Sequence, residues 1–293
     1  MVSARIVGLP PLTTPSAFRP LFRMNLPVRP EFKVIDETPE WLVVDKPAPL
    51  IVHPANLQPE PTLLGGIEAL LSFEMANGAR PAIVTRLDRD TSGVVLVAKT
   101  TPAARELGMI MERREAEKEY LAVVHGHPAD AAWESREPIL RAAGTGPVDI
   151  WVRQMVHPGG RPCHTRFRVE RRFARDGRDF ALVRCFPTTG RMHQIRVHLA
   201  AAGHPIAGDK IYSGDGSEYL DWMKHGWSPD LRARLLLPRH ALHATALTIP
   251  WLGDRVTWRS PLPEDLRRFI DGRPPAPADG VILWNRSGPA DRE

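Results

Sequence analysis

A turn of alternating charge contains the first residues that could do chemistry. It runs Arg86-Leu87-Asp88-Arg89-Asp90-Thr91-Ser92-Gly93 and leads into the apolar stretch 93–98. A carboxylate at the entrance to a strand can act as a nucleophile or as a general base. An ordinary turn would use the same residue types, because Asp, Thr and Ser hydrogen-bond the backbone and Gly93 supplies an unusual φ. Taken alone, the segment leaves both interpretations open.

A second polar turn, residues 187–198, precedes an apolar stretch and is crowded with hydrogen-bond donors. If the helix includes the whole turn, Arg191 and Gln194 share one face while His193 and Arg196 point elsewhere. One face could then reach a carboxylate and another a phosphate. An amphipathic helix with a charged flank explains the same pattern.

A tyrosine stands at the head of an expected strand, in the segment Lys118-Glu119-Tyr120. Its ring can stack on a nucleobase, and its hydroxyl can hydrogen-bond or exchange a proton. Strand tyrosines usually belong to the core, so the segment by itself assigns no function to Tyr120.

The elements that must position these residues are strands mixed irregularly with helices. β-branched and aromatic content predicts strands at Trp41–Val44, Gly93–Ala98, Tyr120–His125, Thr165–Val169 and Phe180–Cys185. Helical spacing of apolar residues predicts helices at Leu63–Met75, Ala103–Ala116 and Met192–Ala202, with a short one at Pro263–Ile270. Strands and helices do not alternate strictly and no glycine-rich phosphate loop follows a strand, which disfavours a doubly wound nucleotide-binding fold. We predict an α+β fold with a mixed, mainly antiparallel central sheet and flanking helices.

The domain organisation follows from proline and glycine. Residues 1–33 carry six prolines and are expected to form an extended arm, and 271–293 form a Pro/Gly-rich tail in which Val281–Trp284 could dock. Residues 34–270 are left as the main folded domain. Within it, 217–238 is expected to be a helical insertion, either a lid or a packed surface helix.

Composition and residue spacing disfavour several classes of protein. The chain has 39 Lys and Arg against 34 Asp and Glu, a balance that suits a polyanionic partner. Eight arginines crowd the range 161–184, as a phosphate-binding face or a solvated sheet face would have. Two distant cysteines and isolated histidine pairs disfavour a disulfide framework and a metal site, and a serine hydrolase elbow is missing. The sequence offers no signal peptide or membrane span, so we expect a cytoplasmic protein.

Taken together, the motifs resemble those of the RluA-type family of pseudouridine synthases. That family carries an H-R-L-D-x-x-T-S-G block, a K-x-Y block and a G-R-x-H-Q-I-R-x-H block in this order, and all three have counterparts here. Further matching segments are Asp45-Lys46-Pro47 leading to Val52-His53-Pro54, Gly203–Asp209 and Leu242-His243-Ala244. The resemblance runs from about Val34 to Ile270.

The resemblance implies roles for the residues. The family's catalytic aspartate falls on Asp88, its active-site tyrosine on Tyr120, and the arginine that pairs with the aspartate on Arg191. The implied substrate-binding residues are Arg86, Leu87, Thr91, His193, Gln194 and Arg196. One departure is Thr85, which stands where relatives commonly have histidine, so contact with RNA is expected to differ there. A second is the front of the chain, where many relatives carry a small helical RNA-binding module and this chain has a proline-rich stretch.

The implied function is isomerisation of uridine to pseudouridine in ribosomal or transfer RNA by a monomeric enzyme without cofactor or metal. A non-catalytic RNA-binding protein on the same fold is the main alternative, and Thr85 is the one feature that favours it. A glycosidase would need a second acid such as Asp90 beside Asp88, although capping explains Asp90 more simply.

Overall fold

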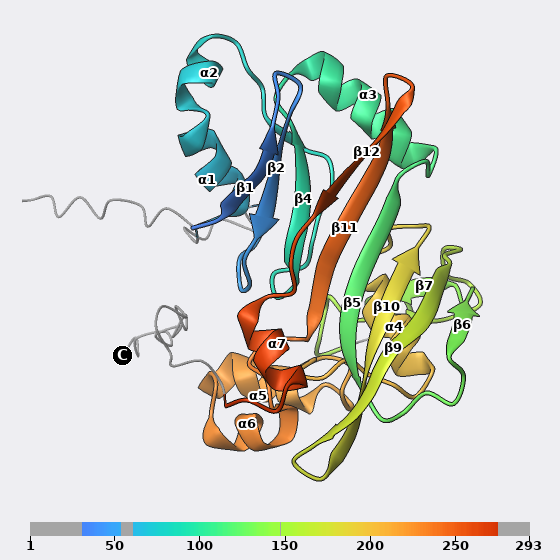
Figure 1. Cartoon of the computed structure of the whole chain (residues 1–293). Helices are drawn as coiled ribbons and strands as arrows, with labels where there is room; N and C mark the ends of the chain where they lie inside the picture. The colour runs from blue at the N-terminus through green and yellow to red at the C-terminus, as the bar shows by residue number, and fades with distance from the viewer. Residues whose placement is uncertain (1–30, 54–60, 147, 275–293) are drawn as a thin grey trace, which may run out of the picture.

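The computed structural model describes residues 31–53, 61–146 and 148–274. The expected N-terminal arm, apart from its last three residues, and the segment Val281–Trp284 lie outside the described residues. Within the described part, a long twisted sheet runs through the molecule, and most of the helices lie against it (Figure 1).

The sheet follows the order β1-β2-β4-β11-β5-β10-β9-β6, with β3 added to β4 and β12 added to β11. Every pairing is antiparallel except the short parallel contact between β4 and β11. The strands are β1 (Lys33–Glu37), β2 (Trp41–Lys46), β3 (Ala82–Ile83), β4 (Ser92–Ala98), β5 (Glu117–His125), β6 (Ala132–Ser135), β9 (Thr165–Arg175), β10 (Arg178–Pro187), β11 (Leu242–Trp251) and β12 (Asp254–Arg259). The predicted mixed, mainly antiparallel sheet is therefore confirmed.

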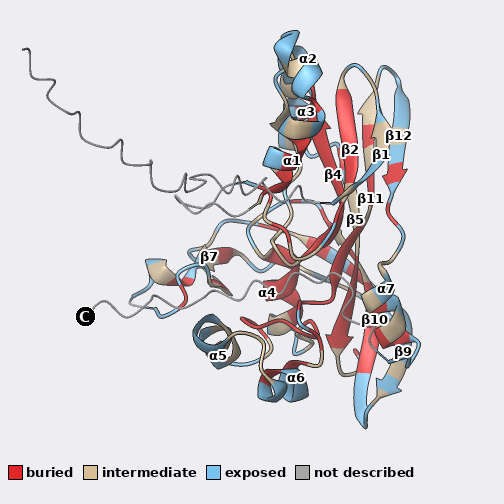
Figure 2. Ribbon diagram, turned by 90° about the vertical axis from the view of Figure 1, so that its left-hand side faces the viewer, coloured by how far each residue is buried: buried red, intermediate tan, exposed pale blue. Residues whose placement is uncertain are grey.

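Helices and a small second sheet cover this frame. The helices are α1 (Leu63–Leu70), α2 (Ser72–Ala76), α3 (Thr101–Glu112), α4 (Gln194–Ala201), α5 (Ser217–His225), α6 (Pro229–Leu235) and α7 (Glu264–Ile270), with a 3₁₀ turn at Ala142–Gly144. Strands β7 (Ile139–Arg141) and β8 (Gln154–Val156) pair with each other in a separate two-stranded sheet. Figure 2, which views the main sheet nearly edge-on, shows α1, α4, α5 and α6 on one side of it.

The predicted elements are present, with shifted ends. The helix expected at Leu63–Met75 is divided at Leu71, and the helix expected from Met192 begins at Gln194, because His193 has the left-handed φ of 57°. The stretch 217–238, which was expected to be helical, contains the two helices α5 and α6. Several strands were not predicted, among them β11, which lies at the centre of the sheet.

The unbroken apolar run of β4 is explained by burial on both faces. All seven of its residues are buried, and alternate side chains enter different clusters. Val94 belongs to the cluster that contains Leu107 of α3, whereas Val95 belongs to the cluster that contains Ile67 of α1. A strand buried on both faces needs no polar alternation.

Gly93 allows β4 to approach β11. Its φ is 116°, and a Cβ atom built on it would lie 2.1 Å from the carbonyl oxygen of Ala244. The parallel register pairs Ala244 with Gly93, and the same strand β11 pairs Ala244 with Tyr120 of β5. A glycine at this position therefore brings the loop that carries Asp88 close to Tyr120.

Candidate functional site

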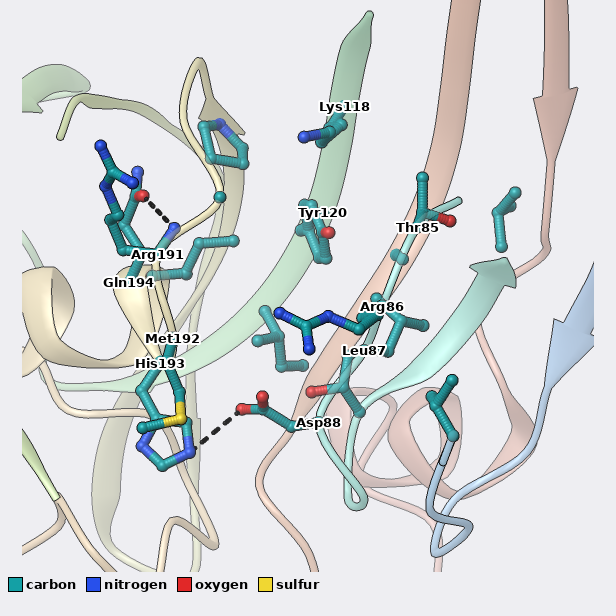
Figure 3. A pocket seen from close by; sticks show the side chains of 18 of the residues that line it. Thr85, Arg86, Leu87, Asp88, Lys118, Tyr120, Arg191, Met192, His193 and Gln194 are labelled. Carbon is teal, nitrogen blue, oxygen red and sulfur yellow. Dashed lines mark hydrogen bonds and ion pairs between the residues drawn. The ribbon is translucent and has the colours of Figure 1, made fainter. Parts of the chain in front are cut away.

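A cavity of about 550 Å³ opens beside β5, β11 and the start of α4. It is lined by all nine residues that the sequence suggested for catalysis or substrate binding: Asp88, Tyr120, Arg191, Arg86, Leu87, Thr91, His193, Gln194 and Arg196. These residues come from the β3–β4 loop, from β5 and from the segment around the start of α4 (Figure 3). Tertiary structure thus brings three separate motifs to one cavity.

Side chains from one face of the neighbouring strands β5 and β11 form a wall of this cavity. Lys118 and Tyr120 of β5 line it, two residues apart, as expected for side chains on one face of a strand. On β11, Ala244 and Ala246 line it as well. The small alanine side chains leave space beside the Tyr120 ring for a flat group such as a base.

The Asp88 carboxylate is bound by Arg196. Nη1 of Arg196 donates to Oδ2 of Asp88 at 2.8 Å, while Nε and Nη2 donate to the two carboxylate oxygens of Asp209 at 2.6 and 2.9 Å. Asp209 is fully buried, whereas the Asp88 side chain remains 29% exposed toward the cavity. Asp209 therefore fixes the guanidinium by a bidentate pair, and the guanidinium in turn orients Asp88.

Charge keeps Asp88 ionised. Burial alone would raise the pKa of its carboxyl, yet His193 in its protonated form and the Arg196 guanidinium hold that pKa below its ordinary value. His193 is neutral at pH 7, because burial and the charge of Arg196 lower its pKa to about 4. The permanent charge of Arg196 is thus the main reason that Asp88 is a carboxylate at neutral pH.

The expected pairing of Arg191 with Asp88 is wrong. Figure 3 shows the Arg191 side chain extending away from Asp88, and its Nε donates to the carbonyl oxygen of Pro162 at 3.4 Å. The prediction placed Arg191 on a helix face, but α4 begins only at Gln194. Arg196, which was expected to contact substrate, lies inside the helix and pairs with the aspartate instead.

His193 lies between Asp88 and a tyrosine that the sequence did not suggest. Its Nδ1 is 2.9 Å from the Tyr212 hydroxyl and its Nε2 is 3.8 Å from Oδ2 of Asp88. The Tyr212 oxygen also accepts the backbone N–H of Gln154 at 2.8 Å. With the Tyr212 O–H donating to Nδ1, the proton of the neutral imidazole is on Nε2 and faces the Asp88 carboxylate.

Two residues expected to bind substrate use their side-chain polar groups in hydrogen bonds within the protein. The Gln194 amide is buried and donates to the His164 carbonyl and the Thr165 hydroxyl, while its oxygen accepts from Thr189 and from the Arg191 backbone. The Thr91 hydroxyl is 2.7 Å from Nε2 of the buried His240. Both side chains therefore shape the cavity rather than offer free polar groups to a ligand.

Lys46 supports the Asp88 loop through the carbonyl oxygen of Arg89. This fully buried lysine donates to the carbonyls of Pro47, Leu50 and Arg89 at 2.9, 2.8 and 3.1 Å, and burial lowers its pKa to about 7. Lys46, Asp209 and Tyr212 were not among the predicted site residues. The motif segments Asp45-Lys46-Pro47 and Gly203–Asp209 contained two of them, and these segments were the available signal.

Arg86 and Tyr120 present free polar groups to the cavity. Arg86 is exposed, and neither its guanidinium nor the Tyr120 hydroxyl hydrogen-bonds to any residue that the structure describes. Burial and the Asp88 charge raise the pKa of Tyr120, so its hydroxyl stays protonated. Thr85 also lines the cavity, but its hydroxyl accepts the backbone N–H of Leu96 at 2.9 Å and is tied to β4.

Arginines in the range 161–184 hydrogen-bond to other parts of the protein. Arg175 donates to the carbonyls of Phe269 and Arg273 at the end of α7, and Arg178 donates to those of Ala233 and Arg234 in α6. Arginines suit such helix ends, whose last carbonyls lack partners within the helix. The range is therefore not a continuous phosphate-binding face.

Among residues 31–53, 61–146 and 148–274, no group of three or more His, Cys, Asp or Glu side chains is arranged to hold a metal ion. In the same part of the chain, no helix is long and apolar enough to cross a membrane.

Comparisons with known proteins agree on one family. The model of the family described as RNA pseudouridylate synthase matches residues 40–201. The chain is 36% identical over 245 residues to the ribosomal large subunit pseudouridine synthase D of Nitrosomonas europaea, covering 81% of this chain and 64% of that protein. It is 37% identical over 243 residues to the protein of the same name from Salmonella typhimurium, covering 81% and 69%. The chain thus spans about two thirds of the length of these relatives.

Solved structures share the fold. Human RNA Pseudouridylate Synthase Domain Containing 4 superposes with a TM-score of 0.63 at 24% identity, over 81% of this chain and 91% of that one. Human RNA Pseudouridylate Synthase Domain Containing 1 gives a TM-score of 0.58 at 23% identity, over 83% and 94%. At these identities the likeness concerns the architecture alone.

Proposed function

The chain belongs to the RNA pseudouridylate synthase family, and we propose that it isomerises uridine in RNA to pseudouridine with Asp88 as the catalytic carboxylate. The observation that carries the assignment is the Asp88–Arg196 ion pair of 2.8 Å at a cavity that also contains Tyr120. The domain responsible is residues 34–270.

The reaction exchanges one bond to the sugar for another. The N1–C1′ bond breaks, the uracil turns while it stays bound, C5 joins C1′, and C5 loses its proton. An ionised carboxylate can assist by attacking C1′ or by taking the C2′ proton to give a glycal. Arg196 supports either route, because it keeps Asp88 charged and restricts its orientation.

The neighbouring residues bind the uracil and the RNA. Tyr120 stacks on the uracil and restrains its rotation beside the alanines of β11. Arg86 and Arg191, at the cavity, contact the RNA backbone, and Leu87 packs against the bound nucleotide. A uridine inside a stacked strand is out of reach, so the target is flipped out of the RNA into the cavity.

The substrate is ribosomal RNA on this proposal. Support comes from the relatives in Nitrosomonas europaea and Salmonella typhimurium, which are named as ribosomal large subunit pseudouridine synthases. Transfer RNA is the second candidate. The enzyme acts as a cytoplasmic monomer and uses no cofactor, since the proposed chemistry needs no redox step.

Asp88→Asn tests the assignment. The amide keeps the size of the carboxyl group but removes its charge, so turnover should fall by at least about a thousandfold. Release of tritium from RNA labelled at C5 of uridine measures turnover, and binding of the same RNA controls for folding. More than trace activity in this variant rules out Asp88 as the catalytic group.

Mapping pseudouridines in cellular RNA with and without the protein identifies the substrate. Loss of a site in ribosomal RNA supports the proposal, and loss in transfer RNA alone redirects it. If no site changes, the protein binds RNA without modifying it.

A further inference from the structure

Lys118 also lines the cavity, and the proposed reaction has not yet given it a role. Lys118 lies on β5 two residues before Tyr120, and both side chains line the cavity. Its neighbours Glu117 and Glu119 point to the other face of the strand, where they pair with Arg255 and Arg184. Strand alternation therefore separates Lys118 from the two nearest acids in the sequence.

The Lys118 ammonium has no anionic partner in the described part of the chain. No hydrogen bond or ion pair joins it to residues 31–53, 61–146 or 148–274, and burial lowers its pKa. Nζ faces Gly190, where an added Cβ would lie 3.7 Å away. A half-buried cation without a counter-ion is costly unless a ligand supplies negative charge.

The reaction supplies that charge on the uracil. When the N1–C1′ bond breaks, its electron pair leaves with the base, and the negative charge spreads over N1, O2 and O4. The pair is used again when C5 bonds to C1′, and the C5 proton then leaves. A cation aimed at the detached base stabilises the charge when it develops, and in a cavity screened from water this effect is large.

The arrangement in the cavity suits this role. Figure 3 shows Lys118 and Tyr120 following one another along β5, with Asp88 beyond Tyr120. Two residues along a strand are about 6–7 Å apart, which is comparable with the length of a pyrimidine ring and its oxygens. With C1′ at Asp88 and the ring against Tyr120, the far edge of the base is directed toward Lys118.

We propose that Lys118 stabilises the uracil anion during glycosidic bond cleavage by placing its ammonium against a carbonyl oxygen of the base. The inference rests on the proposed function and adds an electrophilic group to it. Lys118 acts in bond breaking, whereas an RNA-positioning lysine would act in binding alone.

The test compares Lys118→Met with Lys118→Arg under single-turnover conditions. Lys118→Met should slow uridine conversion by about a hundredfold or more, with RNA affinity nearly unchanged, and Lys118→Arg should recover much of the rate. Lys224→Met removes one exposed positive charge from α5 and serves as the matched control. Thermal unfolding of each variant separates a chemical defect from a folding defect.

RNA with 5-fluorouridine at the target position sharpens the test. Fluorine withdraws electrons and stabilises the detached base, so the ratio of wild-type to Lys118→Met rates should be smaller than for uridine. The C-linked product keeps fluorine at C5, because this substrate has no C5 proton to lose, and chromatography with mass spectrometry of digested RNA follows that product. Equal ratios on the two substrates overturn the proposal, because the rate loss is then independent of charge on the base.

Two further outcomes are distinct. If Lys118→Met weakens RNA binding and leaves the single-turnover rate within about threefold, Lys118 contacts a phosphate and the inference is wrong. If the wild-type protein converts no uridine in any RNA, the proposed function itself fails.

Discussion

Arg196 joins two carboxylates of unequal exposure, the buried Asp209 and the cavity-facing Asp88. The bidentate contact with Asp209 uses Nε and Nη2, so that only Nη1 is available to Asp88. The Tyr212 ring lies under the same guanidinium, with its centroid 5.0 Å from Cζ. This arrangement holds a charge in one orientation before any substrate arrives, which lowers the cost of reorganisation during the reaction.

Arg196→Lys should therefore reduce turnover far more than Arg191→Lys. A lysine keeps the charge but cannot hold Asp209 and Asp88 with one planar group. A lysine ammonium cannot replace both hydrogen bonds to the buried Asp209, so the melting temperature should fall as well. Arg191→Lys is the comparison variant, because it makes the same change in an arginine that donates to the Pro162 carbonyl at 3.4 Å and makes no hydrogen bond with Asp88. Tritium release and thermal unfolding measure both variants, and the reverse order of activities contradicts the assignment of Arg196.

Gly93→Ala should destabilise the fold and abolish activity together. The new Cβ would meet the Ala244 carbonyl oxygen at 2.1 Å, in addition to the strain of φ 116°. Gly177→Ala, in the β9–β10 turn, isolates the backbone strain, since φ is 72° there and nothing lies within 4 Å of the added atom. Strain alone costs about 1–3 kcal/mol, and Gly93→Ala should exceed that in urea unfolding. Similar losses in both variants would show that the approach of β11 to Gly93 is not limiting.

His193 should make the fold less stable in acid. Its pKa falls from 6.5 in the unfolded chain to about 4 in the fold, so the unfolded state binds more protons between these values. The contribution of His193 to the free energy of unfolding is complete above pH 6.5 and decreases as the pH drops toward 4. Below pH 4 the titration of His193 causes no further change. His193→Gln should reduce the slope by up to about 1.4 kcal/mol per pH unit. Urea unfolding at pH 4 to 7 measures the slope, and parallel curves for variant and wild type contradict the prediction.

The sequence alone determined which segments carry chemistry and what kind of fold holds them. β-branched runs and helical spacing are local properties, so the α+β class and the main strands followed from them, and the spacing of Asp88, Tyr120 and the 187–198 turn matched one family. Strand β11 escaped prediction although it lies beside Tyr120. Its place at the centre of the sheet depends on partners far away in sequence.

Only the tertiary structure decided which arginine serves Asp88. Arg191 and Arg196 are five residues apart in one polar turn. The family resemblance assigned the pairing to Arg191, whereas α4 begins only at Gln194, after the left-handed φ of His193, and it is Arg196 inside the helix that pairs with Asp88. Asp209, which holds Arg196, comes from a later loop, and Lys46, which holds the Asp88 loop, comes from an earlier strand. Ion pairs of this kind are fixed by the three-dimensional approach of buried groups, and no spacing along the chain encodes that approach.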